Sequence, residues 1–124
     1  IGGQHVPVAA VSTAFPSGRA SMTVKIQDVS HKLKDADITF GNLEGVILND
    51  GGTQKNCNNP KLCYLFRTPE NYVENLISSG FDLLSSANNH AGDFGDEGRK
   101  NTVRILDSVG IFLMCKIIYV KNLH

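Results

Sequence analysis

Short apolar segments alternate with amphipathic helical patterns along this chain, and this alternation restricts the fold more than any other feature. Segments typical of strands occupy residues 6–15, 37–43, 81–86 and 111–120. The segments between them are typical of helices, at about 22–36, 68–80 and 96–109. Strands that are separated by helices usually form parallel βαβ units. The sequence therefore predicts an α/β fold with a parallel sheet.

Local signals predict where the helix at 68–80 begins and where both later helices end. Thr68-Pro69-Glu70 has the form of a helix start, with a capping hydroxyl, a proline in the first turn and an acid near the positive end of the dipole. Gly80 and Gly110 predict the C-terminal ends. The residues expected to face the core are Val73, Leu76 and Ile77 in the first helix and Val103, Leu106 and Val109 in the second. Between strand and helix, residues 45–64 are rich in Asn, Gly and Pro and predict a long loop.

Composition narrows the class of protein. A chain of 124 residues with 41 % hydrophobic and 19 % charged residues is typical of one globular domain. Its 12 basic and 12 acidic side chains give a net charge of zero, which argues against nucleic acid as a partner. No apolar run approaches the roughly 18 residues of a membrane-spanning helix. The chain begins with Ile1 and has no signal-peptide pattern, so we expect either that an upstream piece was removed or that the chain is a fragment.

Two of the three cysteines lie close together. Cys57 and Cys63 bracket a polar turn at residues 58–62 that brings them within reach of a disulfide, whereas Cys115 lies far along the chain. A zinc site is less well supported, because no second pair of Cys or His lies nearby at ligand spacing. The spacing alone supports a disulfide and a pair of reduced thiols equally.

Polar side chains follow two neighbouring strands of the predicted sheet. Glu44 follows the strand at 37–43, and Asn88-Asn89-His90 and then Asp93 follow the strand at 81–86. Parallel neighbours place such residues at one edge, where a carboxylate, an amide oxygen and an imidazole suit a divalent metal such as Mn²⁺, Mg²⁺ or Zn²⁺. The alternative is that these groups only make turn hydrogen bonds or face solvent, and spacing alone favours that alternative.

Two segments, in this order, resemble the bacterial capsule-biosynthesis CapA family, which is associated with poly-γ-glutamate capsules. They are residues 35–45 (Asp-Ala-Asp-Ile-Thr-Phe-Gly-Asn-Leu-Glu-Gly) and 80–95 (Gly-Phe-Asp-Leu-Leu-Ser-Ser-Ala-Asn-Asn-His-Ala-Gly-Asp-Phe-Gly). That family is related to calcineurin-like metallophosphoesterases, whose two sheets stack between helix layers around a two-metal centre. The resemblance implies that residues 1–124 form the N-terminal half of such a domain, an incomplete αββα sandwich built from parallel βαβ units.

The resemblance also implies roles for individual residues. Glu44 would be a metal ligand that bridges two divalent ions, and Asn89 would bind one ion through its amide oxygen. His90 would be catalytic, stabilising charge on a substrate oxygen or donating a proton to it. Asn42 and Asp93 would orient these groups. The metal would be one or two ions of Mn²⁺, Mg²⁺ or Zn²⁺.

The chain departs from the family pattern at its beginning. Family members open with a strand that ends in Gly-Asp, whose aspartate is the first metal ligand, but residues 7–12 (Pro-Val-Ala-Ala-Val-Ser) contain no acid. The family's later histidines are also missing from this sequence. We therefore expect a truncated or degenerate member in which Glu44, Asn89 and His90 alone bind a cation weakly.

Three functions follow from the resemblance. The first is metal-assisted hydrolysis or transfer on a phosphoester or a capsule polymer. The second is a non-enzymatic role in capsule synthesis or export, binding an anionic polymer or membrane proteins of that machinery. The third is an inactive fragment. The family also implies an extracytoplasmic or cell-surface protein, tethered to the membrane through a segment absent from this chain, and that setting favours a bridge between Cys57 and Cys63.

Overall fold

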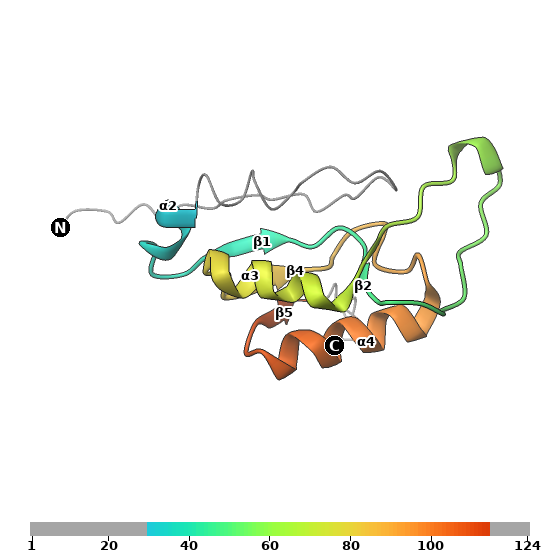
Figure 1. Ribbon diagram of the computed structural model, residues 1–124. Coiled ribbons are helices and arrows are strands. Elements are labelled where there is room, and N and C mark those ends of the chain that lie inside the picture. Colours follow the sequence, from blue (N-terminus) through green and yellow to red (C-terminus); the bar gives the residue numbers. More distant parts are fainter. Residues whose placement is uncertain (1–29, 115–124) are drawn as a thin grey trace, which may run out of the picture.

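The computed structural model describes residues 30–114 (Figure 1). In chain order, the elements are α2 (Ser30–Lys34), β1 (Phe40–Asn42), β2 (Val46–Ile47), η1 (Pro60–Leu62), β3 (Arg67–Thr68), η2 (Glu70–Tyr72), α3 (Val73–Ser79), β4 (Leu83–Ser85), α4 (Gly95–Ser108) and β5 (Phe112–Met114). The strand expected at 6–15, most of the helix expected at 22–36 and the end of the strand expected at 111–120 lie outside the described residues. Among residues 30–114, no helix has the length and apolar character that crossing a membrane requires.

The main sheet has three parallel strands in the order β1-β4-β5. Phe40 is in register with Leu83, and Leu83 with Phe112. One hydrophobic core covers this sheet, and helices α2, α3 and α4 all contribute to it, with Leu33, Leu76 and Leu106 packed in the same cluster as Leu84. The α/β prediction with parallel βαβ units is confirmed, and the described residues form a sheet with helices packed on it, as in part of the expected sandwich.

A second, two-stranded parallel ladder joins β2 to β3. This corrects the loop expected from residue 45, because Val46 and Ile47 are buried strand residues. Gly45 makes the ladder possible: it has φ of 111°, and a Cβ at this position would lie 2.7 Å from the Phe66 carbonyl oxygen. The absence of a side chain lets the backbone after β1 approach Phe66.

Helix α4 packs against β2 through a face that matches the expected one only in part. Leu106 is buried and Val109 packs against the core, as predicted. The buried residues are Gly98, Thr102, Ile105 and Leu106, whereas Val103 is 38 % exposed, so the prediction that Val103 faces the core is wrong. The reason is a polar contact: Thr102 Oγ1 accepts a hydrogen bond from the Ile47 N–H (2.8 Å) and donates one to the Gly98 carbonyl (2.8 Å). The edge of β2 therefore sets the rotation of α4.

The beginning of α3 also differs from the prediction. Thr68 belongs to β3 and does not cap the helix, which is preceded by the 3₁₀ turn η2. The Glu70 N–H instead donates to the Asn49 side-chain oxygen (3.0 Å), which comes from a distant loop. Ile77 is exposed, contrary to expectation. The two predicted ends are confirmed: Gly80 (φ 84°) directly follows α3, and Gly110 (φ 75°) follows α4 after the cap residue Val109.

We predict that Thr102→Val lowers the free energy of unfolding by about 1–3 kcal/mol, because it leaves the buried Ile47 N–H without an acceptor. The matched control is Thr102→Ser, which keeps the hydroxyl and loses a methyl group, and it should cost about 1 kcal/mol. Urea unfolding of the three proteins tests this. Equal stability of Thr102→Val and wild type would show that the contact between α4 and β2 does not depend on this hydrogen bond.

Candidate metal and acid–base site

The site lies where β1 and β4 end side by side. Because the two strands are parallel neighbours, the segments that follow them emerge at the same edge of the sheet. Glu44 comes from the segment after β1 and His90 from the segment after β4. Glu44 Oε1 lies 3.7 Å from His90 Nε2, with the Glu44 side chain 25 % exposed. The structure thus brings together a carboxylate and an imidazole from distant parts of the sequence, at a point that solvent reaches.

Asn88 joins the two segments. Its side-chain nitrogen donates to the Leu43 carbonyl (2.8 Å) and to Asn42 Oδ1 (3.2 Å), and its side-chain oxygen accepts from the His90 N–H (3.0 Å). The sequence pattern points to the run Asn88-Asn89-His90 and to Asn42, but it does not predict that Asn88 is the residue that links the two segments. Asn42 contacts the site through Asn88, which in turn fixes the backbone of His90.

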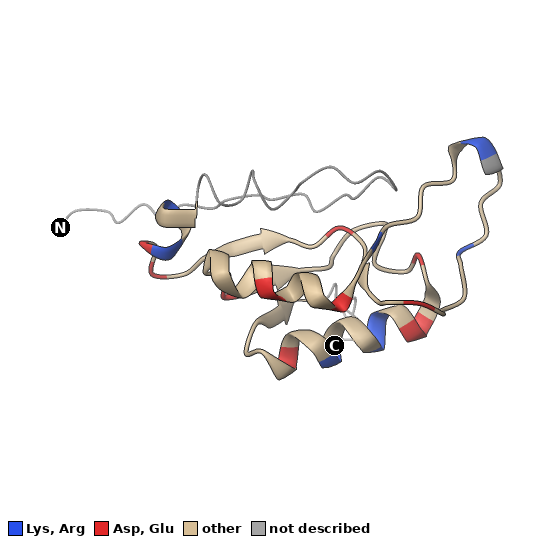
Figure 2. Ribbon diagram, viewed as in Figure 1, with Lys and Arg blue, Asp and Glu red and all other residues tan. Residues whose placement is uncertain are grey.

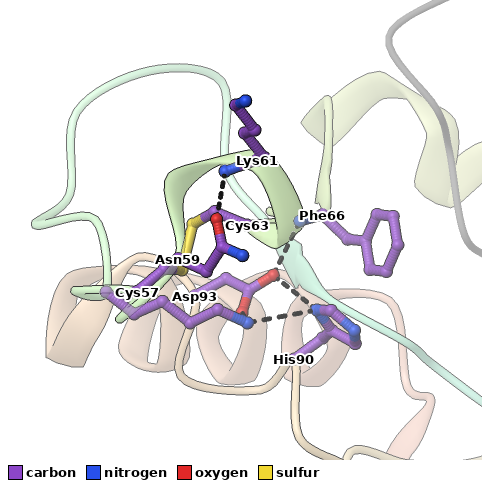
Figure 3. Close-up of a disulfide and its surroundings, with 8 residues drawn as sticks. Cys57, Asn59, Lys61, Cys63, Phe66, His90 and Asp93 are labelled. Atoms are coloured by element: carbon purple, nitrogen blue, oxygen red, sulfur yellow. Dashed lines mark hydrogen bonds and ion pairs between the residues drawn. A yellow bond between two sulfur atoms is a disulfide. The ribbon is translucent and has the colours of Figure 1, made fainter.

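A buried carboxylate holds the His90 ring. Asp93 is fully buried, and its Oδ2 lies 2.8 Å from His90 Nδ1 and accepts the Phe66 N–H at 2.7 Å. Figure 3 shows these contacts, with the Phe66 ring centroid 4.1 Å from that of His90. Since a carboxylate only accepts hydrogen bonds, His90 Nδ1 carries the hydrogen. His90 Nε2 is then the ring nitrogen that faces Glu44.

Lys55 compensates the other oxygen of this carboxylate. Its Nζ lies 2.5 Å from Asp93 Oδ1 and 3.5 Å from His90 Nδ1. Within the described residues, Asp93 Oδ1 has no hydrogen bond of regular geometry. The Lys55 backbone N–H also donates to the Asp93 carbonyl (2.9 Å). Lys55 could not be predicted from the sequence, because nothing in the pattern of the long loop indicates which of its residues returns to the sheet edge.

The remaining predicted residues lie close by. Asn89 is exposed, between Asn88 and His90 on the same loop. Cys57 and Cys63 form a disulfide, with their Cα atoms 5.6 Å apart (Figure 3).

Glu44, Asn89 and His90 are residue types that bind divalent cations in proteins. Glu44 and Asn89 offer oxygen ligands, and His90 offers an imidazole nitrogen. Within residues 30–114, no group of three or more His, Cys, Asp or Glu could hold a metal ion. The stretch 7–12, in which the family pattern would place an aspartate, lies outside the described residues. The described residues therefore bring together one carboxylate and one imidazole at this edge, which are fewer side chains than a closed metal site needs.

A small pocket of about 180 Å³ lies behind the loop after β4. Gly45, Ala87, Asn88 and Ala91 line one side of it, and α4 lines the other. Neither Glu44 nor His90 lines this pocket, so it is separate from the edge at which these two side chains meet.

Comparison with known proteins identifies the family. The family of bacterial capsule synthesis proteins, PGA_cap, matches residues 1–114. The chain belongs to this family. The capsule biosynthesis protein CapA of Bacillus anthracis is 33 % identical over 87 residues, which cover 66 % of this chain and 21 % of that protein. The uncharacterized proteins y4sH and y4uA of Sinorhizobium fredii (strain NBRC 101917 / NGR234) are each 36 % identical over 88 residues, 68 % of this chain and 18 % of theirs.

The predicted resemblance to the CapA family is confirmed by these matches. The chain spans about a fifth of the length of the curated relatives it matches. The two quoted segments, 35–45 and 80–95, lie inside the matched range and contain the residues that meet at the sheet edge.

We predict that Asn88→Ala lowers the free energy of unfolding by about 1–3 kcal/mol, because the Leu43 carbonyl and the His90 N–H lose their partner. Asn89→Ala is the matched control: the side chain is the same and adjacent but exposed, and its loss should change stability by less than about 0.5 kcal/mol. Chemical unfolding of both variants is the measurement. Equal effects of the two substitutions would contradict the role given to Asn88.

Proposed function

We propose that this member of the capsule synthesis family carries part of a metal-dependent hydrolytic site of the metallophosphoesterase type, formed by Glu44, Asn89 and His90. Its substrate would be a phosphoester or a capsule polymer. The observation that supports this most is the 3.7 Å approach of Glu44 to His90, combined with the buried Asp93 behind the imidazole. If these residues only made turn hydrogen bonds or faced solvent, a buried carboxylate that orients the His90 ring would have no purpose.

Each residue would have a separate task. Glu44 and Asn89 would hold a divalent cation, which supplies polarisation of a substrate oxygen or of a bound water. Asp93 keeps the hydrogen of the His90 ring on Nδ1, so Nε2 is the atom that takes a proton from a reacting oxygen or returns it. Phe66, packed on the ring, limits its rotation and shields it from water.

The small number of ligands limits what these residues can do alone. One carboxylate and one amide offset little of the cost of removing water from a divalent ion. We therefore expect weak cation binding by this chain, with turnover depending on further ligands such as the aspartate of the family pattern.

The same shortage of ligands favours the second candidate, a non-enzymatic component that binds an anionic polymer or a partner protein.

The charges of α4 give little support to a polymer-binding surface on this helix. Acidic and basic side chains are interspersed along this helix (Figure 2). Arg99 hydrogen-bonds Asp96 and so lowers the pKa of that carboxyl, and Arg104 pairs with Glu70 at 3.1 Å. These cations already have acidic partners.

The location proposed for the protein is extracytoplasmic. The Cys57–Cys63 disulfide supports this, because disulfides persist in oxidising compartments and are rare in the cytosol.

We predict that Mn²⁺ added to the full chain broadens the NMR signals of residues around Glu44, Asn89 and His90 before those of the rest of the protein. Paramagnetic broadening suits this question because it detects weak binding and locates it. Glu44→Gln keeps the shape of the side chain but removes its charge, and it should abolish the selective broadening.

Glu74→Gln is the control for this experiment, because Glu74 is an exposed carboxylate on α3, away from the sheet edge. It should leave the broadening unchanged. Broadening that is spread evenly over exposed acids, or that survives in Glu44→Gln, would contradict the metal site.

A further inference from the structure

The chain between β2 and β3, residues 48–66, forms a long excursion that leads away from the site and returns to it. On the outgoing side, Lys55 contacts Asp93 through its Nζ (2.5 Å to Oδ1) and through its backbone N–H (2.9 Å to the carbonyl). On the returning side, the Phe66 N–H donates to Asp93 Oδ2 (2.7 Å), and the Phe66 ring packs on His90. Both ends of the excursion therefore hold the same pair, Asp93 and His90 (Figure 3).

The turn at residues 58–64 has little packing of its own, whereas Leu65, next to Phe66, packs against Val46, Leu48 and Phe94. Asn58, Asn59, Leu62 and Tyr64 are exposed. The hydrogen bonds of this turn are local, from the Leu62 N–H to the Asn59 carbonyl (3.0 Å) and from the Lys61 N–H to Asn59 Oδ1 (3.0 Å). The Cys57–Cys63 disulfide is the covalent link across its base, two residues after Lys55 and three before Phe66.

We propose that this disulfide is a redox switch for the site: when oxidised, it holds Lys55 and Phe66 against Asp93 and His90, and its reduction releases them. As regulation of the site, the inference rests on the proposed function. The reductant is a dithiol, which transfers two electrons and two protons to the sulfur–sulfur bond. Cys57 and Cys63 become thiols, and the dithiol becomes a cyclic disulfide.

The physical basis is the entropy of the excursion. The bridge restricts the conformations of the chain between Lys55 and Phe66. The chain therefore loses less conformational entropy when both residues contact Asp93. After reduction, the same contacts must order a longer and mostly exposed segment. Lys55 has a side chain that is 30 % exposed and is released most easily. Asp93 Oδ1 then lacks its compensating charge, and the His90 ring loses the Phe66 ring that packs on it.

The test is amide hydrogen exchange of the full chain in its oxidised form and after treatment with dithiothreitol, with Cys115→Ser introduced to prevent disulfide exchange. The Lys55 and Phe66 amides should exchange at least about tenfold faster after reduction. The Leu43 amide, bonded to the Ser85 carbonyl at 2.8 Å, should be unchanged and shows that the sheet is intact. Equal protection of Lys55 and Phe66 in both forms would overturn the proposal.

Three variants separate the switch from a general loss of structure. Cys57→Ser/Cys63→Ser should reproduce the reduced state without any reductant. In the oxidised chain, Lys55→Met should shift the NMR signals of the His90 ring protons, whereas the matched variant Lys61→Met, on the exposed turn, should not. A His90 shift of the same size in both lysine variants would count against the proposal.

Mn²⁺ broadening connects the switch to the metal site. Comparing the oxidised chain with Cys57→Ser/Cys63→Ser in the absence of reductant, we expect weaker broadening near His90 in the variant. Identical broadening in the two proteins would show that the switch does not reach the site. If neither protein shows selective broadening, the proposed metal function fails, while the exchange data still decide whether the disulfide holds Lys55 and Phe66.

Discussion

A single buried carboxylate organises this end of the molecule. A charge without access to water is costly unless it is paired and hydrogen-bonded, and Asp93 meets that requirement with partners from three segments. These are the His90 ring, the N–H of Phe66, the residue before β3, and the Lys55 ammonium from the long loop. Satisfying Asp93 therefore fixes an imidazole, the second ladder and a distant loop at the same time.

The parallel sheet supplies the other half of the arrangement. Because β1 and β4 end together, Glu44 and the loop containing His90 share one edge, and Asn88 fastens the two segments to each other. Asp93 contacts the Nδ1 side of the His90 ring, and Glu44 faces the Nε2 side. In a family of capsule synthesis proteins, this pairing of a fixed imidazole with a solvent-accessible carboxylate is the chemical basis of the proposed hydrolytic site.

Features encoded by neighbouring residues could be predicted from the sequence, and features decided by distant partners could not. Apolar periodicity and glycine gave the α/β alternation and the ends at Gly80 and Gly110, and strand polarity placed Glu44 near His90. By contrast, α4 turns its face according to the hydrogen bond between Thr102 and Ile47. The 3₁₀ turn before α3 takes its acceptor from Asn49 and not from Thr68. Lys55 belongs to the same class, because its partner Asp93 lies far along the chain.

The central claim is that the Asp93 charge holds these segments together, and Asp93→Asn tests it most directly. The substitution keeps the shape of the side chain but removes the charge that Lys55, His90 and the Phe66 N–H compensate. We predict that urea unfolding shows a loss of about 2–4 kcal/mol, against less than about 0.5 kcal/mol for the exposed control Asp107→Asn. Equal stability of the two variants would contradict the account.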